Sequence, residues 1–175
     1  MQPAPAPILR RFLAYLVDTL LLTLLTALTI YVMIGPRLVY VAIGLTVVEA
    51  LYKPIMESRY GWTLGKLSQK IMVIDAATGR RPDFNQSLMR YLPWGLGMFA
   101  SIFLILQYAK DPAFAEVADG WAYLDYERDS PWRKNTILAI IQQVPLFSSA
   151  WMVGDVLRQA IHDKLARTLV VNFPE

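Results

Sequence analysis

Residues 11–34 of this chain read RFLAYLVDTLLLTLLTALTIYVMI, and this stretch decides the class of protein. After Arg11 its only charged side chain is that of Asp18. A helix needs about 20 apolar residues to cross the hydrocarbon core of a bilayer, so the stretch is long enough to span a membrane. A cleavable signal peptide is the competing interpretation, but the run is too long, contains an aspartate and ends at Gly35-Pro36-Arg37 without a small-residue cleavage pattern.

The composition agrees with a membrane protein. Of the 175 residues, 55% are hydrophobic and 18% are charged, which is more apolar than a soluble domain of this size requires. The absence of cysteine excludes disulfide bonds, thiolate metal sites and cysteine nucleophiles. We expect a single domain over residues 1–175.

Three further apolar stretches predict three more membrane spans. The second of the four predicted spans carries Glu49 and Lys53 and is the least apolar, whereas the third and fourth spans carry no charge. Gly35 and Pro36 predict a tight turn after the first span, and Pro145 predicts a kink in the fourth. The predicted fold is an all-α membrane protein, a bundle of four transmembrane helices at about 12–34, 38–57, 91–109 and 135–154.

The basic residues indicate an orientation. The loop 58–90 is net basic and the tail 155–175 carries further basic residues, whereas the loop 110–134 is rich in acids and aromatic residues. By the positive-inside rule, we expect loop 58–90, the tail and both termini in the cytoplasm of a bacterium, with the chain in its inner (plasma) membrane. Loop 110–134 is then the outer loop, and its aromatic residues favour a segment lying on the lipid headgroups over a ligand site.

The cytoplasmic loop contains two short β-prone segments. Residues 70–75 and 80–84 flank a turn at Gly79. This pattern predicts a short β-hairpin-like loop.

Ionisable residues at membrane depth are the candidate functional groups, because a charge in hydrocarbon costs at least about 2.5 kcal/mol. Asp18 lies two helical turns beyond Arg11, and Glu49 reaches a similar depth on the second span. One interpretation is a proton- or cation-binding site formed by Asp18, alone or with Glu49. The alternative is that Lys53, one turn after Glu49, simply pairs with it.

A second polar group is predicted at the membrane edge. Arg90 precedes the third span and Asp155 follows the fourth, so both could form a cluster with Arg11. Such pairs either support transport or lock helix ends together, and both interpretations stay open.

Other motifs do not indicate an enzyme. The segment 61–66, GWTLGK, is one residue short of a phosphate-binding loop and is followed by Leu67 instead of a serine or threonine. The single histidine, His162, cannot form a multi-histidine metal site, and no nucleophile elbow accompanies it. We therefore expect no enzymatic activity, no cofactor and no metal site.

Three blocks in order resemble the RDD family of membrane proteins, which is named for an arginine and two aspartates. The first is 11–18, with Arg11 and Asp18, and the last is 162–171, HDKLARTLVV, which makes Asp163 the second aspartate. Between them, a block similar to the family's cytoplasmic loop contains Gly61, Thr63, Gly65 and Lys66, followed by a short strand and Arg90. The chain departs from the family pattern at Lys70, where a glycine is expected, and in its long acidic outer loop.

The resemblance implies a class of function but no substrate. Transport has been proposed for the family, and cation/proton antiport is attributed to some members. We expect transport of a cation, proton or small solute through an Asp18-centred polar cluster, in a homodimer because four helices rarely enclose a path. The alternative is a non-transporting membrane anchor or an accessory subunit that binds another membrane protein. The lipid bilayer is the expected surrounding, and no nucleic acid is expected as a partner.

The last block also predicts a cytoplasmic cap. Residues 162–171 lie beyond the last span, so we expect them to pack on the loop 58–90. Asp163 would then accept hydrogen bonds from a backbone N–H group or a loop arginine.

Overall fold

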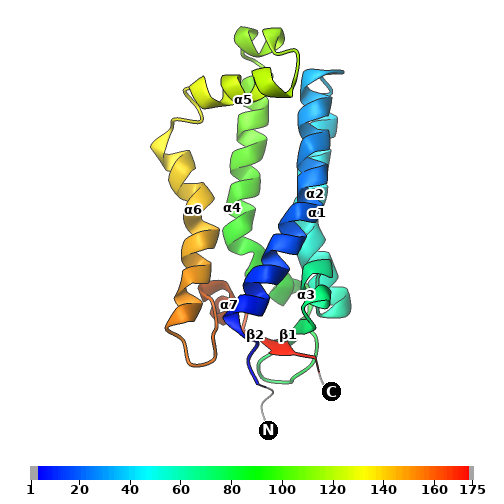
Figure 1. Cartoon of the computed structure of the whole chain (residues 1–175), viewed down its shortest axis with the longest axis vertical. Coiled ribbons are helices and arrows are strands. Elements are labelled where there is room, and N and C mark those ends of the chain that lie inside the picture. Colours follow the sequence, from blue (N-terminus) through cyan, green and yellow to red (C-terminus); the bar gives the residue numbers. More distant parts are fainter. Residues whose placement is uncertain (1–3, 174–175) are drawn as a thin grey trace. The chain divides into compact units, whose positions relative to one another are not determined.

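The computed structural model describes residues 4–173 and is mostly helical (Figure 1). Four helical segments of this part of the chain are long and apolar enough to cross a membrane. They are α1 (Ile8–Ile34), α2 (Val39–Tyr60), α4 (Phe84–Tyr108), and α6 (Thr136–Ala150) with the short η2 (Trp151–Val153) that continues it. The prediction of four long apolar helices is confirmed, and Pro145 lies inside α6 without ending it.

The third long helix begins earlier than the sequence predicts, at Phe84 instead of residue 91. Asp83 and Gln86 exchange hydrogen bonds there. The Asp83 carboxylate accepts from the Gln86 N–H at 2.7 Å, and the Gln86 side chain accepts from the Asp83 N–H at 3.0 Å. This reciprocal cap satisfies N–H groups that would otherwise lack partners, so the helix begins before the apolar stretch does. Arg90 therefore lies inside α4 and not ahead of it.

The chain divides into two compact units, and each long helix contributes to both. Unit 1 comprises Met1–Leu21, Leu51–Pro93 and Pro145–Glu175, and unit 2 comprises Leu22–Ala50 and Trp94–Val144.

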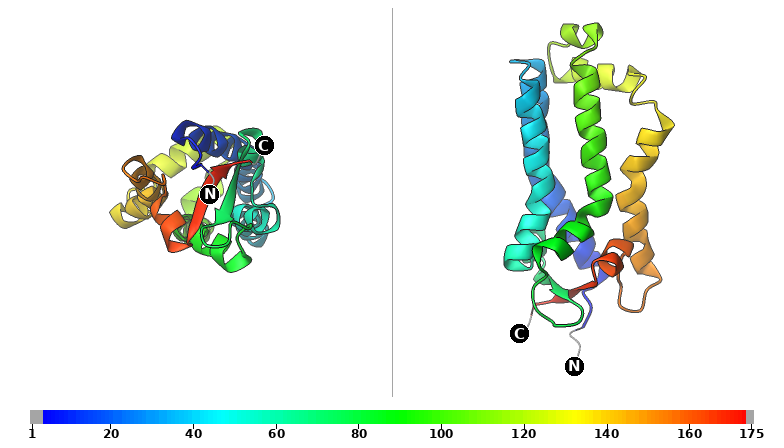
Figure 2. Two further views of the ribbon diagram at one scale, coloured as in Figure 1. Left: turned by 90° about the horizontal axis from the view of Figure 1, so that it is seen from below. Right: turned by 180° about the vertical axis from the view of Figure 1, so that it is seen from behind.

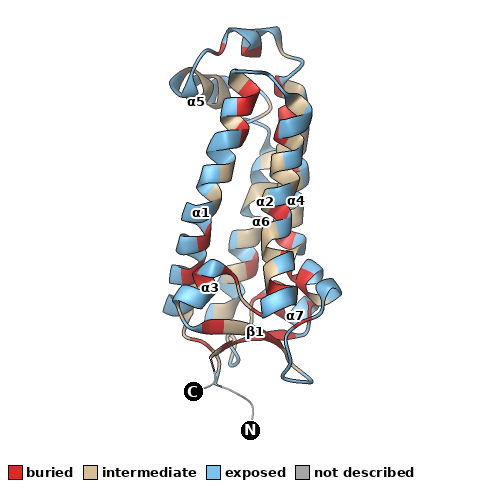
Figure 3. Cartoon of the chain, turned by 90° about the vertical axis from the view of Figure 1, so that its right-hand side faces the viewer, coloured by how far each residue is buried: buried red, intermediate tan, exposed pale blue. Residues whose placement is uncertain are grey.

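Unit 1 contains a small sheet of two strands, β1 (Ile71–Asp75) and β2 (Thr168–Asn172). They run antiparallel with Ile71 opposite Asn172 and Asp75 opposite Thr168, and lie side by side when viewed from below (Figure 2). Burial of Ile71, Val73 and Val170 with Ala6 and Ala14 makes one apolar core of the unit (Figure 3). The predicted packing of the last block on the loop is thus observed.

The predicted β-hairpin of residues 70–75 and 80–84 is wrong, because the partner strand comes from the end of the chain. A turn does form, since the Asp75 N–H donates to the Arg80 carbonyl at 2.7 Å and the Gly79 N–H donates to the Asp75 carbonyl at 3.0 Å. Beyond it, Pro82 has no N–H to offer to a ladder and Asp83 caps α4. The chain therefore leaves the sheet, and residues 168–172 pair instead.

Two short helices complete unit 1. They are α3 (Leu64–Ser68), which has Thr63 as its N-cap, and α7 (Ile161–Leu165). Gly61 precedes α3 at a φ of +81°, and its carbonyl accepts from the Val73 N–H at 2.6 Å. A left-handed backbone favours glycine, so Gly61 is the residue that lets the chain turn from α2 to the sheet.

Replacing Lys70 by glycine is expected to stabilise the protein by about 0.5–1 kcal/mol. Lys70 has a φ of +54°, a left-handed conformation that glycine adopts without strain. Thermal unfolding in detergent measures the gain. The neighbouring Gln69 has a φ of −97°, so Gln69→Gly is the control and should destabilise instead. Equal effects of the two substitutions would contradict the explanation.

Unit 2 has its own apolar core, in which Val32, Met33 and Ala42 pack with Leu104 and Tyr108. The predicted outer loop is folded here as η1 (Pro112–Glu116) and α5 (Gly120–Asp129). Its aromatic residues are divided between two environments. Phe114 is buried and stacks on Tyr108 with 5.8 Å between ring centroids, whereas Trp121 is 80% exposed. Phe114 thus packs within the protein, and only part of the loop is left to contact headgroups.

Candidate functional site

Asp18 is held by the loop that follows α2. Among the described residues, its carboxylate accepts from the Thr63 hydroxyl at 2.6 Å, the Gly65 N–H at 2.8 Å and the Tyr52 hydroxyl at 3.1 Å. Its exposure is 1%. The carboxylate is thereby hydrogen-bonded at both oxygens, which replaces the water lost on burial.

Gly65 is required by the close packing of α3 against α1. A Cβ atom at Gly65 would lie 2.0 Å from the Ala14 carbonyl oxygen and 2.8 Å from the Asp18 Cγ. Thr63 also caps α3, since its hydroxyl accepts from the Lys66 N–H at 3.3 Å. The loop block 61–66 therefore docks α3 against α1.

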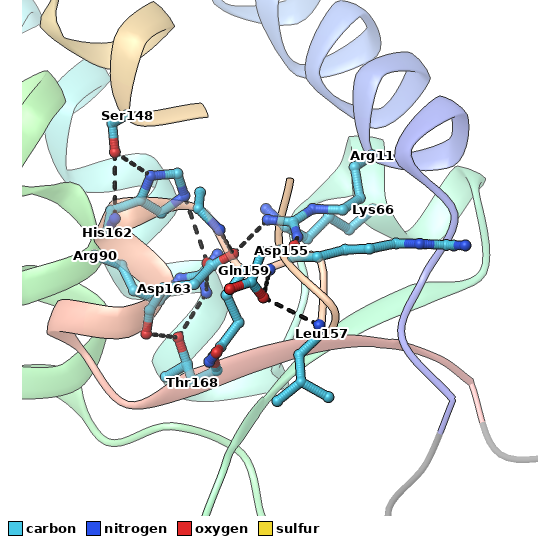
Figure 4. A network of polar contacts seen from close by, with 12 residues as sticks. Arg11, Lys66, Arg90, Ser148, Asp155, Leu157, Gln159, His162, Asp163 and Thr168 are labelled. Atoms are coloured by element: carbon cyan, nitrogen blue, oxygen red, sulfur yellow. Dashed lines mark hydrogen bonds and ion pairs between the residues drawn. The ribbon is translucent and has the colours of Figure 1, made fainter. Parts of the chain in front are cut away.

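Beside the loop that holds Asp18 lies a chain of ion pairs, which we call the ion-pair cluster: Arg11, Glu57, Lys66, Arg90 and Asp163. Figure 4 shows four of these residues, Arg11, Lys66, Arg90 and Asp163. Glu57 is 2.8 Å from the Lys66 ammonium and 2.9 Å from Arg90 Nε. Asp163 pairs with Arg90 through one oxygen and with Arg11 through the other. The cluster thus connects α1, α2, α3 and α4 to α7.

The cluster is almost completely buried and its polar atoms have partners. Asp163 is 0% exposed, Glu57 is 4% exposed and Arg90 is 5% exposed. Asp163 accepts in addition from the Ala160 N–H at 3.0 Å, and Arg90 donates to the Thr168 hydroxyl at 2.7 Å. The expected backbone and arginine donors to Asp163 are confirmed, with arginines from the helices.

The charge state of Asp163 follows from these neighbours. Burial raises the pKa of its carboxyl, but Arg90 and Arg11 outweigh burial and hold the pKa well below its usual range. Asp163 is therefore ionised at neutral pH.

His162 and Ser148 lie next to the cluster. Ser148 Oγ accepts from the His162 N–H at 3.2 Å and lies 2.9 Å from His162 Nδ1, while His162 Nε2 is 3.5 Å from Asp163. The order resembles a serine–histidine–aspartate triad. However, Asp163 is engaged by two arginines and Ser148 is 4% exposed. These contacts tie α6 to α7.

Acidification is expected to destabilise the protein through His162. Burial lowers the pKa of His162 from 6.5 to about 3, so between these values the unfolded state binds more protons than the folded state. Stability therefore rises with pH across this window and is complete above about pH 6.5. Denaturant unfolding at pH 6 and pH 5 should show a loss of about 1 kcal/mol that His162→Gln removes. An equal loss in the variant would contradict this role.

The other candidate residues are placed differently. Asp155 forms its ion pair with Lys164 and accepts from the Leu157 and Gln159 N–H groups, so its predicted pairing with Arg11 and Arg90 is not observed among the described residues. Lys53 lies over the Tyr15 ring, 5.1 Å from its centroid. Glu49 belongs to unit 2, where both of its carboxylate oxygens lie 3.3 Å from the Thr26 hydroxyl.

Sequence reasoning missed two members of the site. Glu57 is only the last residue of the predicted second span, 38–57, whereas in the structure it lies inside α2 and bridges Lys66 and Arg90. Nothing in the sequence around Tyr52 indicates that its hydroxyl binds Asp18. Arg90 lies next to an apolar stretch, and a buried arginine requires an acid as its partner, so Arg90 is the signal that could have led to Glu57.

One comparison with known proteins identifies a relationship. The family model described as RDD family matches residues 5–167. The match includes Arg11, Asp18 and Asp163 together with the loop block 61–66. No curated protein and no solved structure matches the chain.

Proposed function

Because this chain belongs to the RDD family and is a membrane protein with four long apolar helices, we propose that it serves as a membrane anchor or accessory subunit of a membrane protein complex. The proposal includes a bacterial plasma membrane with both termini in the cytoplasm, as the basic loops favour. One observation supports it above the others: the Asp18 carboxylate accepts three hydrogen bonds and is 1% exposed.

A transport site has to exchange its ligand, and Asp18 is poorly suited to do so. Hydrogen bonds to a charged group are worth about 1.5–3 kcal/mol each, so releasing the donors would cost several kcal/mol. Two of the donors are Thr63 and Gly65, which are fixed by the capping and close packing of α3. These contacts favour a lock between helices over a passage for ions.

An accessory subunit needs a surface for its partner, and α5 offers one. Trp121 is 80% exposed and Leu124 is 51% exposed, and acidic residues lie around them on the same short helix. Tryptophan is enriched among the residues that dominate protein interfaces. The outer segment is therefore the part of this chain that we expect to contact another membrane protein.

Cation or proton transport is the second candidate, and Glu49 favours it. This carboxylate lies inside the apolar part of α2, where both of its oxygens are 3.3 Å from the Thr26 hydroxyl. A carboxyl group in such surroundings is a usual component of proton and cation pathways. Transport would then use Glu49, in a dimer, and Asp18 would only position the helices.

Reconstitution into liposomes separates the two candidates. For an accessory subunit, the purified protein should move neither cations nor protons faster than empty liposomes do. A photo-crosslinking residue at Trp121 should give a discrete adduct in cells, and one at the equally exposed Leu20 of α1 serves as the control. Flux that Glu49→Gln abolishes would overturn the proposal in favour of transport. Flux that Asp18→Asn abolishes in a protein with unchanged melting would restore Asp18 as the transport site.

A further inference from the structure

The exposed charged side chains of unit 1 are mostly basic. Asp18, Glu57 and Asp163 are all buried. In contrast, seven basic residues of the unit are exposed. Lys164 pairs with Asp155, and we call the other six the basic rim: Arg10, Arg59, Lys70, Arg80, Arg81 and Arg167. Within the described part of the unit, the one fully exposed acid is Asp83. The outer surface of unit 1 is therefore strongly positive although the whole chain has a net charge of only +3.

The basic rim lies next to the ends of the membrane helices. Arg10 is in the first turn of α1, Arg59 is in the last turn of α2, and Arg80 and Arg81 come just before α4. The ends of spanning helices lie at the level of the phospholipid headgroups. Four of the six bases are thus placed at the depth of lipid phosphates by the chain itself.

The remaining two bases occupy strained positions at opposite ends of the sheet. Lys70 has a φ of +54° and Arg167 a φ of +53°, a conformation in which glycine is relaxed. The Lys70 carbonyl accepts from the Phe173 N–H at one end of the sheet, and the Arg167 carbonyl accepts from the Ala76 N–H at the other. Since the backbone groups close the sheet, the side chains are left exposed. Glycine would adopt this backbone conformation at a lower conformational energy than lysine or arginine. The presence of a charged side chain at both positions therefore indicates that the charge has a function.

We propose that the basic rim binds the phosphate groups of anionic phospholipids in the leaflet where α1, α2 and α4 of unit 1 end. Arginine and lysine bind phosphate through charge-assisted hydrogen bonds, and several of them near a surface add their attractions. The position at helix ends favours a lipid over a nucleic acid or an acidic protein, which would not need bases at headgroup depth. The inference rests on the membrane helices and holds for an accessory subunit and a transporter alike.

Thermal unfolding in a neutral detergent tests the inference. Added phosphatidylglycerol should raise the melting temperature by several degrees more than added phosphatidylcholine, and high salt should remove most of the difference. In the triple variant Lys70→Gln, Arg80→Gln, Arg167→Gln, about half of this lipid-dependent rise should disappear, because three of the six bases of the rim are removed. The control triple variant, Lys110→Gln, Arg128→Gln, Lys134→Gln, removes the same charge from unit 2 and should keep the rise.

Each variant is compared with its own melting temperature without lipid, so a change in basal stability does not obscure the result. If the neutral triple variant fails to fold, the charge-conserving Lys70→Arg, Arg80→Lys, Arg167→Lys variant must retain the full response. Equal stabilisation by the two lipids, or equal losses in both triple variants, would overturn the proposal. A rise of the same size with inorganic phosphate would also overturn it, because the site would then be one for a free anion.

Discussion

Replacing Asp163 by alanine is expected to destabilise the protein by about 3–5 kcal/mol, because Arg11 loses the acid that it pairs with and Arg90 loses one of its two acids in a buried site. Arg90 is 5% exposed, and in the absence of Asp163 it keeps Glu57, which Lys66 already shares. The Ala160 N–H at the start of α7 loses its acceptor as well. Detergent-solubilised protein should melt on the order of 10 °C lower, and limited proteolysis should cut near β2.

The control for this prediction is an ion pair on the surface. Asp125 and Arg128 are 3.0 Å apart with side chains 67% and 71% exposed, so Asp125→Ala should change stability by less than about 0.5 kcal/mol. If Asp163→Ala does not fold, Arg11→Gln gives a milder test, since Asp163 then keeps Arg90 as its partner. An Asp163→Ala protein with unchanged melting and protease resistance would mean that the ion-pair cluster does not hold unit 1 together.

The membrane helices could be predicted from the sequence because the bilayer imposes a length and a composition on each span. Arg11 and Arg90 could be predicted to lie near one edge for the same reason, since they flank apolar stretches, whereas the sequence predicts for Asp163 only that it packs on loop 58–90 with the last block. Their mutual contacts depend on which face of each helix turns inward. Asp155 shows that position along the chain does not fix the partner. It lies at the expected edge, but its carboxylate pairs with Lys164, which is nearer along the chain than Arg11 or Arg90.

The error over the β-hairpin has a physical origin, which is a tertiary contact that overrides a local signal. The turn at Gly79 is locally typical of a hairpin, but the strand that pairs with β1 comes from residues 168–172. The sequence predicts that the second helix ends at residue 57, whereas α2 continues to Tyr60. Glu57 therefore lies inside the helix, where it joins the ion-pair cluster.

The contacts of Asp18 and Glu49 could not be predicted from the sequence, because they depend on the three-dimensional structure. Burial of Asp18 could be predicted from the cost of a charge in hydrocarbon. Its donors come from Tyr52, Thr63 and Gly65, and no spacing rule brings these positions to α1. Its use in transport therefore stays a prediction, and the liposome experiment with Asp18→Asn and Glu49→Gln is the measurement that decides it.

Gly65→Ala is expected to be as damaging as loss of the second aspartate, with a cost of about 3 kcal/mol or more. The added Cβ would lie 2.0 Å from a carbonyl oxygen of α1, that of Ala14, and backbone atoms of a helix cannot move aside as a flexible side chain can. Helix α3 would have to shift away from α1. The Gly65 N–H would then leave Asp18, so a buried carboxylate would lose a donor in addition to the clash.

A glycine in open space provides the matched control. A Cβ at Gly97 of α4 would meet nothing within 4 Å, so Gly97→Ala should leave stability unchanged or raise it by up to about 1 kcal/mol. Both variants add one methyl group to a helix, and only the packing differs. Thermal unfolding of the two proteins in the same detergent gives the comparison, and similar melting temperatures would show that α3 does not pack on α1.

A second substitution identifies the cause of the Gly65→Ala defect. If the clash were with a side chain, trimming Ala14 to glycine would relieve it. The contact is with the Ala14 carbonyl oxygen, which Ala14→Gly leaves in place, so the double variant should remain as unstable as Gly65→Ala or become less stable. Rescue by Ala14→Gly would mean that α1 and α3 approach each other through side chains. Glycine at this position would then be needed for space against a side chain and not against the backbone of α1.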